Sequence, residues 1–125
     1  MRPEKQPARF SPFKMAVRVE NIFADLPESS GQEQFLTLFE NEGVRIERIV
    51  SQSHSSPIGF WYDQSECEWV IVLRGHATLE FAGGELIEMK EGDHLTIPSH
   101  VKHRVNQTGP DTIWLAVRVK TDLIK

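Results

Sequence analysis

Short apolar runs separated by glycine-containing turns fill the sequence from residue 44 to residue 120. Several runs are rich in β-branched residues, and Gly83-Gly84 is the kind of tight hairpin turn that needs positive φ. Many short strands at regular spacing are typical of a closed barrel or of two packed sheets. The sequence therefore predicts an all-β domain, with strands near residues 44–50, 60–62, 69–73, 76–82, 85–90, 94–98, 103–108 and 112–120.

A different pattern precedes these strands. Ser30-Gly31-Gln32-Glu33 matches a capping box, in which a serine oxygen and a glutamate satisfy the first free amides of a helix. Apolar residues follow at helical spacing, and Gly43 supplies a C-terminal stop; the apolar residues are Phe35, Leu38 and Phe39. We expect one short N-terminal helix near residues 31–42, packed on the outside of the barrel.

The first fourteen residues differ in composition from the rest. Three prolines interrupt any regular structure there, and basic residues outnumber the single Glu4. Such a segment cannot bury enough apolar surface to fold by itself. The sequence predicts a flexible arm at residues 1–14 and one barrel domain at residues 15–125, a length suited to a single core.

Charge and composition argue against several kinds of partner. The net charge is −4 and no basic run is present, so a nucleic-acid surface is not expected. No apolar stretch approaches the ~20 residues of a membrane span, and no secretory signal is apparent, so we expect a cytoplasmic protein without a membrane partner. Cys67 is the single cysteine, which excludes an internal disulfide and a zinc site built from cysteines.

The strand near residues 69–73 is apolar on both faces. If Glu68 faces inward, so do Val70 and Val72, while Trp69, Ile71 and Leu73 face outward. A strand of this kind must be covered on both sides. The helix near residues 31–42, a second subunit, or both would provide the outer cover. We therefore predict a homodimer.

Two groups of residues resemble the motifs of the cupin superfamily, which are small jelly-roll β-barrels. Glu68 and Gly75 match the second half of the first cupin motif with the correct spacing. Gly92, Pro98 and His103 match the second motif, in which His100 stands at the second glycine and Gln107 at the asparagine. The resemblance covers residues 44–119 and implies a single-domain jelly-roll cupin β-barrel with a degenerate first motif.

The degenerate part is the pair of histidines that precedes the motif-1 glutamate. Trp61 and Asp63 stand at these positions if the gap to the glutamate is four residues, and Tyr62 and Gln64 if it is three. In a typical cupin the two histidines, the glutamate and the motif-2 histidine bind one divalent metal ion. The resemblance implies a three-ligand set of Asp63, Glu68 and His103, with His54, His100 or Gln64 as the fourth ligand. Zinc, manganese or iron suits such ligands.

The alternative is a polar pocket without a metal, in which Glu68 and Asp63 form hydrogen bonds and His103 is an interior histidine. Ion pairs from Arg104 or Arg118 to these acids would favour this alternative. In either case we expect Trp61, Val70 and Val105 to form the pocket wall. His100 and Tyr62 are the candidate catalytic residues.

Three functions remain open. The first is a metal-dependent enzyme of the oxygenase, isomerase or lyase type that acts on a small metabolite. The second is a non-catalytic, metal-free cupin that binds a small ligand, and the third is a structural or partner-binding barrel. We favour the first, because unpaired buried acids are costly and a bound cation would offset that cost.

Overall fold

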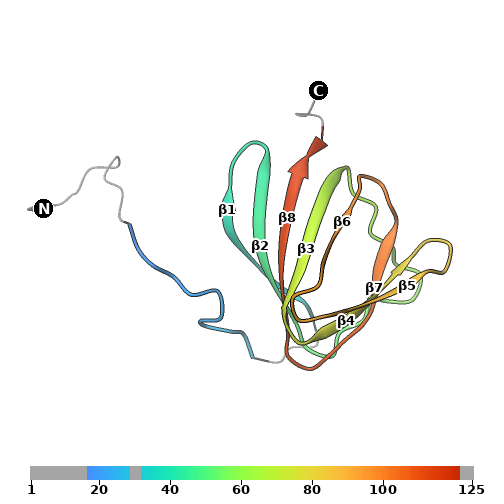
Figure 1. Cartoon of the computed structure of the whole chain (residues 1–125), viewed down its shortest axis with the longest axis horizontal. Helices are drawn as coiled ribbons and strands as arrows, with labels where there is room; N and C mark the ends of the chain where they lie inside the picture. The colour runs from blue at the N-terminus through green and yellow to red at the C-terminus, as the bar shows by residue number, and fades with distance from the viewer. Residues whose placement is uncertain (1–16, 29–31, 122–125) are drawn as a thin grey trace, which may run out of the picture.

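The computed structural model describes residues 17–28 and 32–121 (Figure 1). Eight antiparallel strands make up the fold, and the described residues contain no α-helix. The all-β expectation is confirmed. The strands are β1 (Gln34–Glu40), β2 (Val44–Ser51), β3 (Glu66–Arg74), β4 (His76–Phe81), β5 (Leu86–Lys90), β6 (His94–Ile97), β7 (His103–Thr108) and β8 (Thr112–Lys120).

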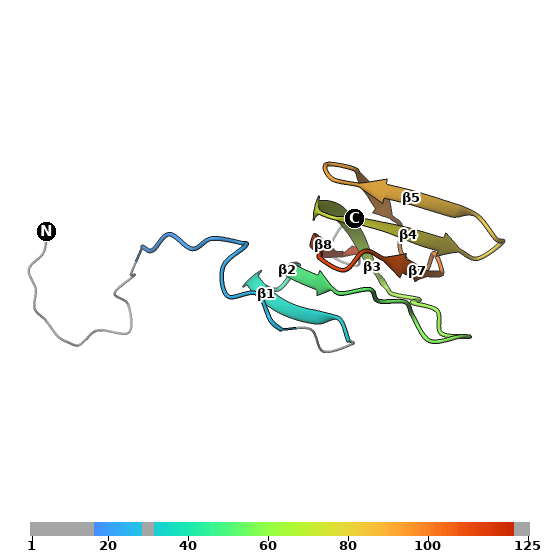
Figure 2. The same cartoon turned by 90° about the horizontal axis from the view of Figure 1, so that it is seen from below.

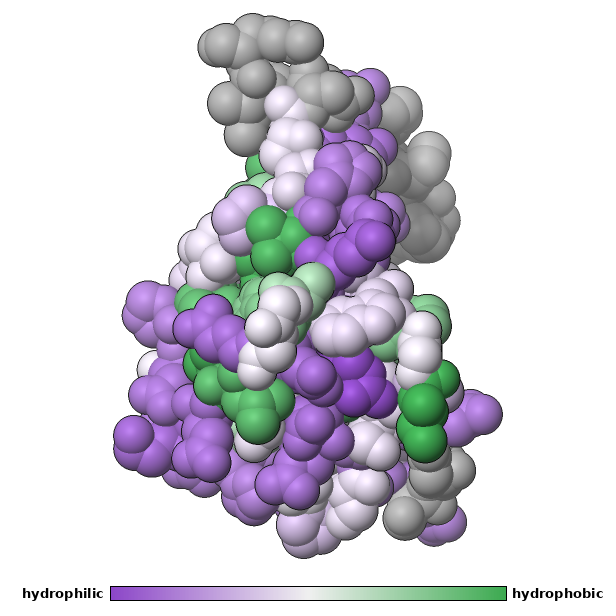
Figure 3. Space-filling view, turned by 90° about the vertical axis from the view of Figure 1, so that its right-hand side faces the viewer, coloured by the Kyte–Doolittle hydropathy of each residue, from purple (hydrophilic) through white to green (hydrophobic). Residues whose placement is uncertain are grey.

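The strands form two sheets that face each other. The larger sheet has five strands in the order β1-β2-β8-β3-β6, and the smaller has three in the order β5-β4-β7. Figure 2 shows the small sheet crossing over one end of the large one. Hydrophilic side chains cover most of the face that carries the small sheet, with a few scattered hydrophobic ones (Figure 3). This two-layer arrangement is the jelly-roll architecture expected from the sequence.

The core lies between the two sheets and is built from one face of each strand. On β3 the inward residues Glu68, Val70 and Val72 are buried, whereas Trp69 and its outward neighbours are only partly so. The parity predicted for this strand is therefore confirmed. On β8, Trp114 and Ala116 are buried on the same inner side, directly opposite residues of β3.

Gly75 closes the tight turn between β3 and β4. It has φ +87°, and a Cβ at this position would lie 2.6 Å from the carbonyl oxygen of Asp111 and 2.7 Å from Oγ1 of Thr112. Both the backbone conformation and the close approach of the start of β8 therefore require glycine here. This explains why the glycine that follows Glu68 in the motif lies where it does.

The predicted helix near residues 31–42 is wrong, because this segment contains strand β1. Phe35 pairs with Ile49 and Thr37 with Glu47 in an antiparallel ladder with β2, so sheet pairing overrides the helical spacing. The carboxylate of Glu33 does not cap a helix but accepts a hydrogen bond from the Ser51 hydroxyl at 2.8 Å.

The segment before β1 lies against the outer face of β2. Nη1 of Arg48 donates to the carbonyl oxygens of Ile22 at 3.2 Å and Ala24 at 2.7 Å, which ties this segment to the sheet. The predicted flexible arm at residues 1–14 lies outside the described residues. In the described part of the chain, no helix is long and apolar enough to cross a membrane.

Candidate functional site

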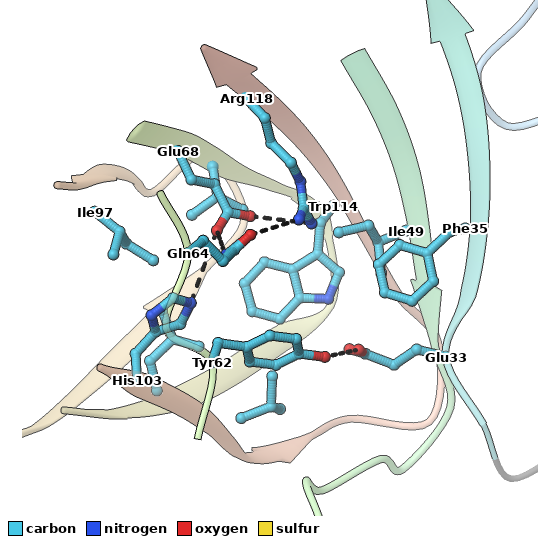
Figure 4. A pocket seen from close by; sticks show the side chains of 13 residues that line it. Glu33, Phe35, Ile49, Tyr62, Gln64, Glu68, Ile97, His103, Trp114 and Arg118 are labelled. Carbon is cyan, nitrogen blue, oxygen red and sulfur yellow. Dashed lines mark hydrogen bonds and ion pairs between the residues drawn. The ribbon is translucent and has the colours of Figure 1, made fainter. Parts of the chain in front are cut away.

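A pocket opens between the sheets, over the inner face of the large one (Figure 4). The volume in which the centre of a water molecule can lie is about 40 Å³. The empty space of the pocket together with its mouth is about 420 Å³. Because one water needs roughly 10–15 Å³ on the first measure, the pocket suits a small ligand. Its lining residues are Glu33, Phe35, Ile49, Tyr62, Gln64, Glu68, Val70, Leu79, Ile97, His103, Val105, Trp114 and Arg118.

Glu68, Gln64 and Arg118 form one polar end of the pocket. Nη2 of Arg118 lies 3.5 Å from Oε2 of Glu68, and its Nη1 donates to Oε1 of Gln64 at 2.7 Å. The Gln64 amide in turn donates to Oε1 of Glu68 at 3.2 Å. Nε of Arg118 is 3.2 Å from Oε1 of Glu47 without being aligned for a hydrogen bond. One guanidinium therefore serves two buried carboxylates.

The protein interior changes the acidity of Glu68. Burial raises the pKa of its carboxyl above the ordinary 4.5, and the charges of Arg118 and His103 oppose part of this rise. Glu68 therefore holds its proton more readily than an exposed glutamate. A carboxyl of this kind, beside an imidazole in a pocket, is suited to proton exchange with a ligand.

His103 brings an imidazole next to Glu68. Its Nδ1 lies 2.9 Å from the carbonyl oxygen of Val101, so Nδ1 carries the proton and Nε2 is an acceptor in the neutral ring. Nε2 is 3.7 Å from Oε1 of Glu68 and faces the pocket (Figure 4). The ring stacks on Tyr62 with centroids 5.4 Å apart.

Tyr62 and Glu33 form the second polar end. The Tyr62 hydroxyl donates to Oε1 of Glu33 at 3.5 Å, and Ser51 links Oε2 of Glu33 to the indole N–H of Trp114 at 3.0 Å. Burial, followed by the charge of Glu33, raises the pKa of Tyr62 to about 12. The Tyr62 phenol is therefore a hydrogen-bond donor at any physiological pH.

The structure brings Glu68, His103 and Gln64 together, but it places the other predicted metal ligands, Asp63, His54 and His100, elsewhere. Asp63 pairs instead with His100, Oδ1 to Nδ1, at 2.8 Å, and both side chains are exposed, at 42% and 67%. His100 adopts φ +63°, a backbone conformation that favours glycine. This explains why the second motif has a glycine at this position. His54 does not line the pocket, and its Nε2 lies 3.8 Å from Oε1 of Glu33.

The expected pocket wall is met in part. Val70 and Val105 line the pocket. Trp61 does not, because its ring lies on the outer side, where the guanidinium of Arg104 sits 5.9 Å from its centroid. Of the two candidate catalytic residues, Tyr62 reaches the pocket and His100 does not.

A divalent metal ion does not fit the residues found here. Glu68, His103 and Gln64 are the candidate ligands that meet in the pocket, but Arg118 donates to the Gln64 oxygen at 2.7 Å and places a permanent positive charge 3.5 Å from the Glu68 carboxylate. Among the described residues, no group of three or more His, Cys, Asp or Glu side chains is arranged to hold a metal ion. A structural or catalytic zinc site needs at least three protein ligands.

Two pocket residues, Glu33 and Arg118, were not among the predicted ligands, catalytic residues or wall residues. Glu33 was placed in a capping box, and nothing in its neighbourhood indicates an inward carboxylate. Arg118 shares the inward parity of Trp114 and Ala116 on the last strand, and this alternation is the signal that identifies it.

Comparisons with known proteins agree with the fold. The family described as Cupin domain matches residues 52–118, which is more than half of the chain. A structure from Ralstonia eutropha JMP134, named "putative mannose-6-phosphate isomerase", is 42% identical, with 82% of this chain and 98% of that one covered at a TM-score of 0.78. No curated protein matches the sequence at a significant level.

More distant structures share the fold alone. A cupin superfamily protein from Desulfitobacterium hafniense DCB-2 is 17% identical, with 75% of this chain and 83% of that one covered at a TM-score of 0.65. An RmlC-like cupin family protein from Methanocaldococcus jannaschii is 20% identical, with 77% and 87% covered at a TM-score of 0.62. The family match, the two-sheet fold and the positions of Glu68 and His103 agree, and this chain belongs to the cupin family.

Proposed function

We propose that this cupin binds a small organic molecule in its barrel pocket through its own side chains, without a divalent metal ion. The observation that carries the proposal is the position of Arg118, whose guanidinium lies 3.5 Å from Glu68 and forms a hydrogen bond to Gln64. A buried carboxylate needs a compensating cation, and here the chain supplies it. These contacts favour the alternative interpretation of the sequence, a polar pocket without a metal in which Arg118 pairs with an acid.

The rest of the pocket has the features of a ligand site. Apolar and aromatic side chains form its walls, and polar groups gather at two ends, Glu68 with His103 at one and Glu33 with Tyr62 at the other (Figure 4). Small-molecule sites are usually concave and mostly apolar, with a few polar groups that fix orientation. The zinc, manganese or iron ion expected from the sequence has weaker support, since it would have to compete with Arg118 for Glu68.

The test is a thermal-shift screen of small metabolites against protein freed of metal by EDTA and dialysis. A ligand at 100 times its Kd stabilises the folded state by about 2.7 kcal/mol. We expect at least one compound to stabilise the wild type and the His94→Ala variant, whose exposed imidazole contacts Trp69 outside the pocket. The same compound should have little effect on Gln64→Ala or His103→Ala.

Metal binding is measured on the same samples by calorimetry with Zn²⁺, Mn²⁺ and Fe²⁺. Stoichiometric binding that disappears in His103→Ala, combined with no stabilisation of the metal-free protein by any compound, would support the metal-dependent function instead.

A second candidate function is acid–base isomerisation of a sugar. Glu68 and His103 place two titratable groups 3.7 Å apart in one pocket, and the 42% identical structure is named "putative mannose-6-phosphate isomerase". In such a reaction one group moves a proton from the carbon beside a carbonyl to the carbonyl carbon, while a second group moves the proton of the adjacent hydroxyl to the carbonyl oxygen. Incubation with mannose 6-phosphate, followed by NMR, tests this: wild type should convert the sugar, and Glu68→Gln and His103→Ala should not.

A further inference from the structure

The pocket presents many hydrogen-bond acceptors and few available donors. Nε2 of His103 accepts in the neutral ring, because Nδ1 donates to a backbone carbonyl. The carboxylates of Glu33 and Glu68 each offer about four lone-pair sites, more than their observed partners occupy. The donors nearby are already engaged: the Tyr62 hydroxyl with Glu33, and the Gln64 amide with Glu68.

Negative charge exceeds positive charge in the same space. Glu33 and Glu68 line the pocket with side chains only 7% and 8% exposed. Of the residues that line it in the described part of the chain, Arg118 alone carries a permanent positive charge, and it is shared between Glu68 and Glu47. His54 faces Glu33 at 3.8 Å but is charged only when protonated.

Aromatic side chains form much of the remaining wall. Phe35, Tyr62 and Trp114 line the pocket, and in Figure 4 the Tyr62 hydroxyl points towards the carboxylate of Glu33. Aromatic faces attract cations through their quadrupole, most strongly when the site is desolvated. The aromatic walls therefore favour a positively charged ligand, as the two carboxylates do.

A phosphate or carboxylate group would find the opposite environment. Its partner would have to be Arg118, which it would share with two buried carboxylates at close range. Like charges brought together in a site of low dielectric constant repel strongly. An anionic ligand is therefore disfavoured by the groups that hold Arg118, which argues against a sugar phosphate and so against the second candidate function.

We propose that the pocket selects a small organic ammonium compound, with its N–H groups directed at Glu33, whose carboxylate is not one of the two that Arg118 pairs with, and its apolar body against the aromatic wall. The inference rests on the proposed function, since it specifies the ligand class of the same pocket. An ammonium group supplies several donors and no acceptor, which complements the acceptor-rich ends. Its charge also offsets the excess of buried carboxylates.

Three probes that share one isobutyl group separate charge from shape: isobutylamine, isobutanol and isovalerate. Each is titrated into ¹⁵N-labelled, metal-free protein near pH 7, where the amine is an ammonium ion. The reporter is the indole N–H of Trp114, which donates to Ser51 in the pocket wall and is assigned by its loss in Trp114→Phe. The indole signals of Trp61 and Trp69 serve as internal controls, because neither residue lines the pocket.

We expect isobutylamine to shift the Trp114 signal with a Kd at least tenfold lower than that of isobutanol, and isovalerate to produce no shift. Glu33→Gln and Glu68→Gln, which keep the shape and remove the charge, should each reduce the preference for the amine over the alcohol. Glu88→Gln, an exposed glutamate on β5, should leave it unchanged.

Two outcomes overturn the inference and are distinguishable from a failure of the proposed function. If isobutanol binds as tightly as isobutylamine, or isovalerate binds most tightly, the pocket still binds small molecules but does not select cations. If isobutylamine shifts no pocket signal in wild type, the inference fails, and the proposed function is judged by its own metabolite screen.

Discussion

Replacement of Arg118 by methionine tests the electrostatic centre of the pocket. Arg118 is 11% exposed and its two carboxylate partners are 12% and 8% exposed, so the substitution strands two buried charges. Breaking a buried ion pair by removing one partner costs about 3–5 kcal/mol. A small domain has about 5–15 kcal/mol in total, so Arg118→Met should unfold at much lower urea concentration than wild type at pH 7.

The pH dependence of this loss identifies its cause. Removing the guanidinium also removes an influence that lowers the pKa of Glu68, so this pKa rises further in Arg118→Met. A group whose folded pKa is raised stabilises the fold below its unfolded pKa, and this contribution is lost as pH rises through the folded pKa. The difference in unfolding free energy between wild type and Arg118→Met should therefore shrink as pH falls from 7 towards 4.5, the ordinary pKa of the Glu68 carboxyl.

Three further variants control the measurement. Arg118→Lys retains a charge and should lose less, and Arg118→Met combined with Glu68→Gln should recover part of the stability because one stranded charge is gone. Arg18→Met removes an exposed pair, 75% and 77% exposed, and should change stability by less than about 1 kcal/mol. A cost below about 1 kcal/mol for Arg118→Met at pH 7, or a cost that does not fall with pH, would refute the reasoning.

Three other predictions follow from the same structure. Tyr62 is the single tyrosine, so the 295 nm absorbance of the folded protein should titrate near pH 12, and that of the protein in urea near the ordinary 10.0. The protonated phenol should contribute fully to stability below pH 10.0, and this contribution should be lost as pH rises towards 12. A midpoint near 10 in the folded protein would show that the phenol is not buried beside Glu33. His100→Gly should keep or raise the melting temperature, because relief of the strained φ of +63° gains about 1 kcal/mol, which offsets the loss of an exposed ion pair with Asp63. A fall of several degrees would mean that the ion pair stabilises the fold by more than the strain costs. The predicted homodimer is supported by the half-exposed apolar side chains of β1, which are Phe35, Leu36, Leu38 and Phe39. Light scattering at micromolar concentration should give a mass of twice 14.3 kDa, and a monomer mass would contradict the prediction.

Most of the fold follows from the sequence because its signals are local. Glycine turns and β-branched runs locate β2 to β8 closely, and the alternation around Glu68 places the correct face inward. The strand predicted at residues 60–62 is wrong, because Tyr62 makes only an isolated antiparallel bridge to His103 there. β1 was assigned to the wrong class because Phe35, Leu38 and Phe39 fit a helical stripe. The conformation of that segment is determined by its pairing with β2. This pairing is a tertiary contact, which the local spacing of apolar residues does not indicate.

The site is less predictable, since it depends on which side chains meet across the sheets. Spacing relative to the motifs identified Glu68 and His103, which do meet. The same spacing suggested Asp63 as their partner, but the backbone turns that side chain outward to His100. Glu33, which directly precedes β1, and Arg118 on β8 reach the pocket from segments far from the motifs in the sequence, and no motif marks them.

A crystal structure determined after soaking with Zn²⁺, and another with the compound that stabilises the metal-free protein most, test the central claim directly. We predict that the compound occupies the pocket beside Tyr62 and Trp114, and that Arg118 keeps its contacts with Glu68 and Gln64 in both crystals. An anomalous zinc peak about 2.0–2.2 Å from Nε2 of His103 and a Glu68 oxygen, with Arg118 displaced, would contradict the account.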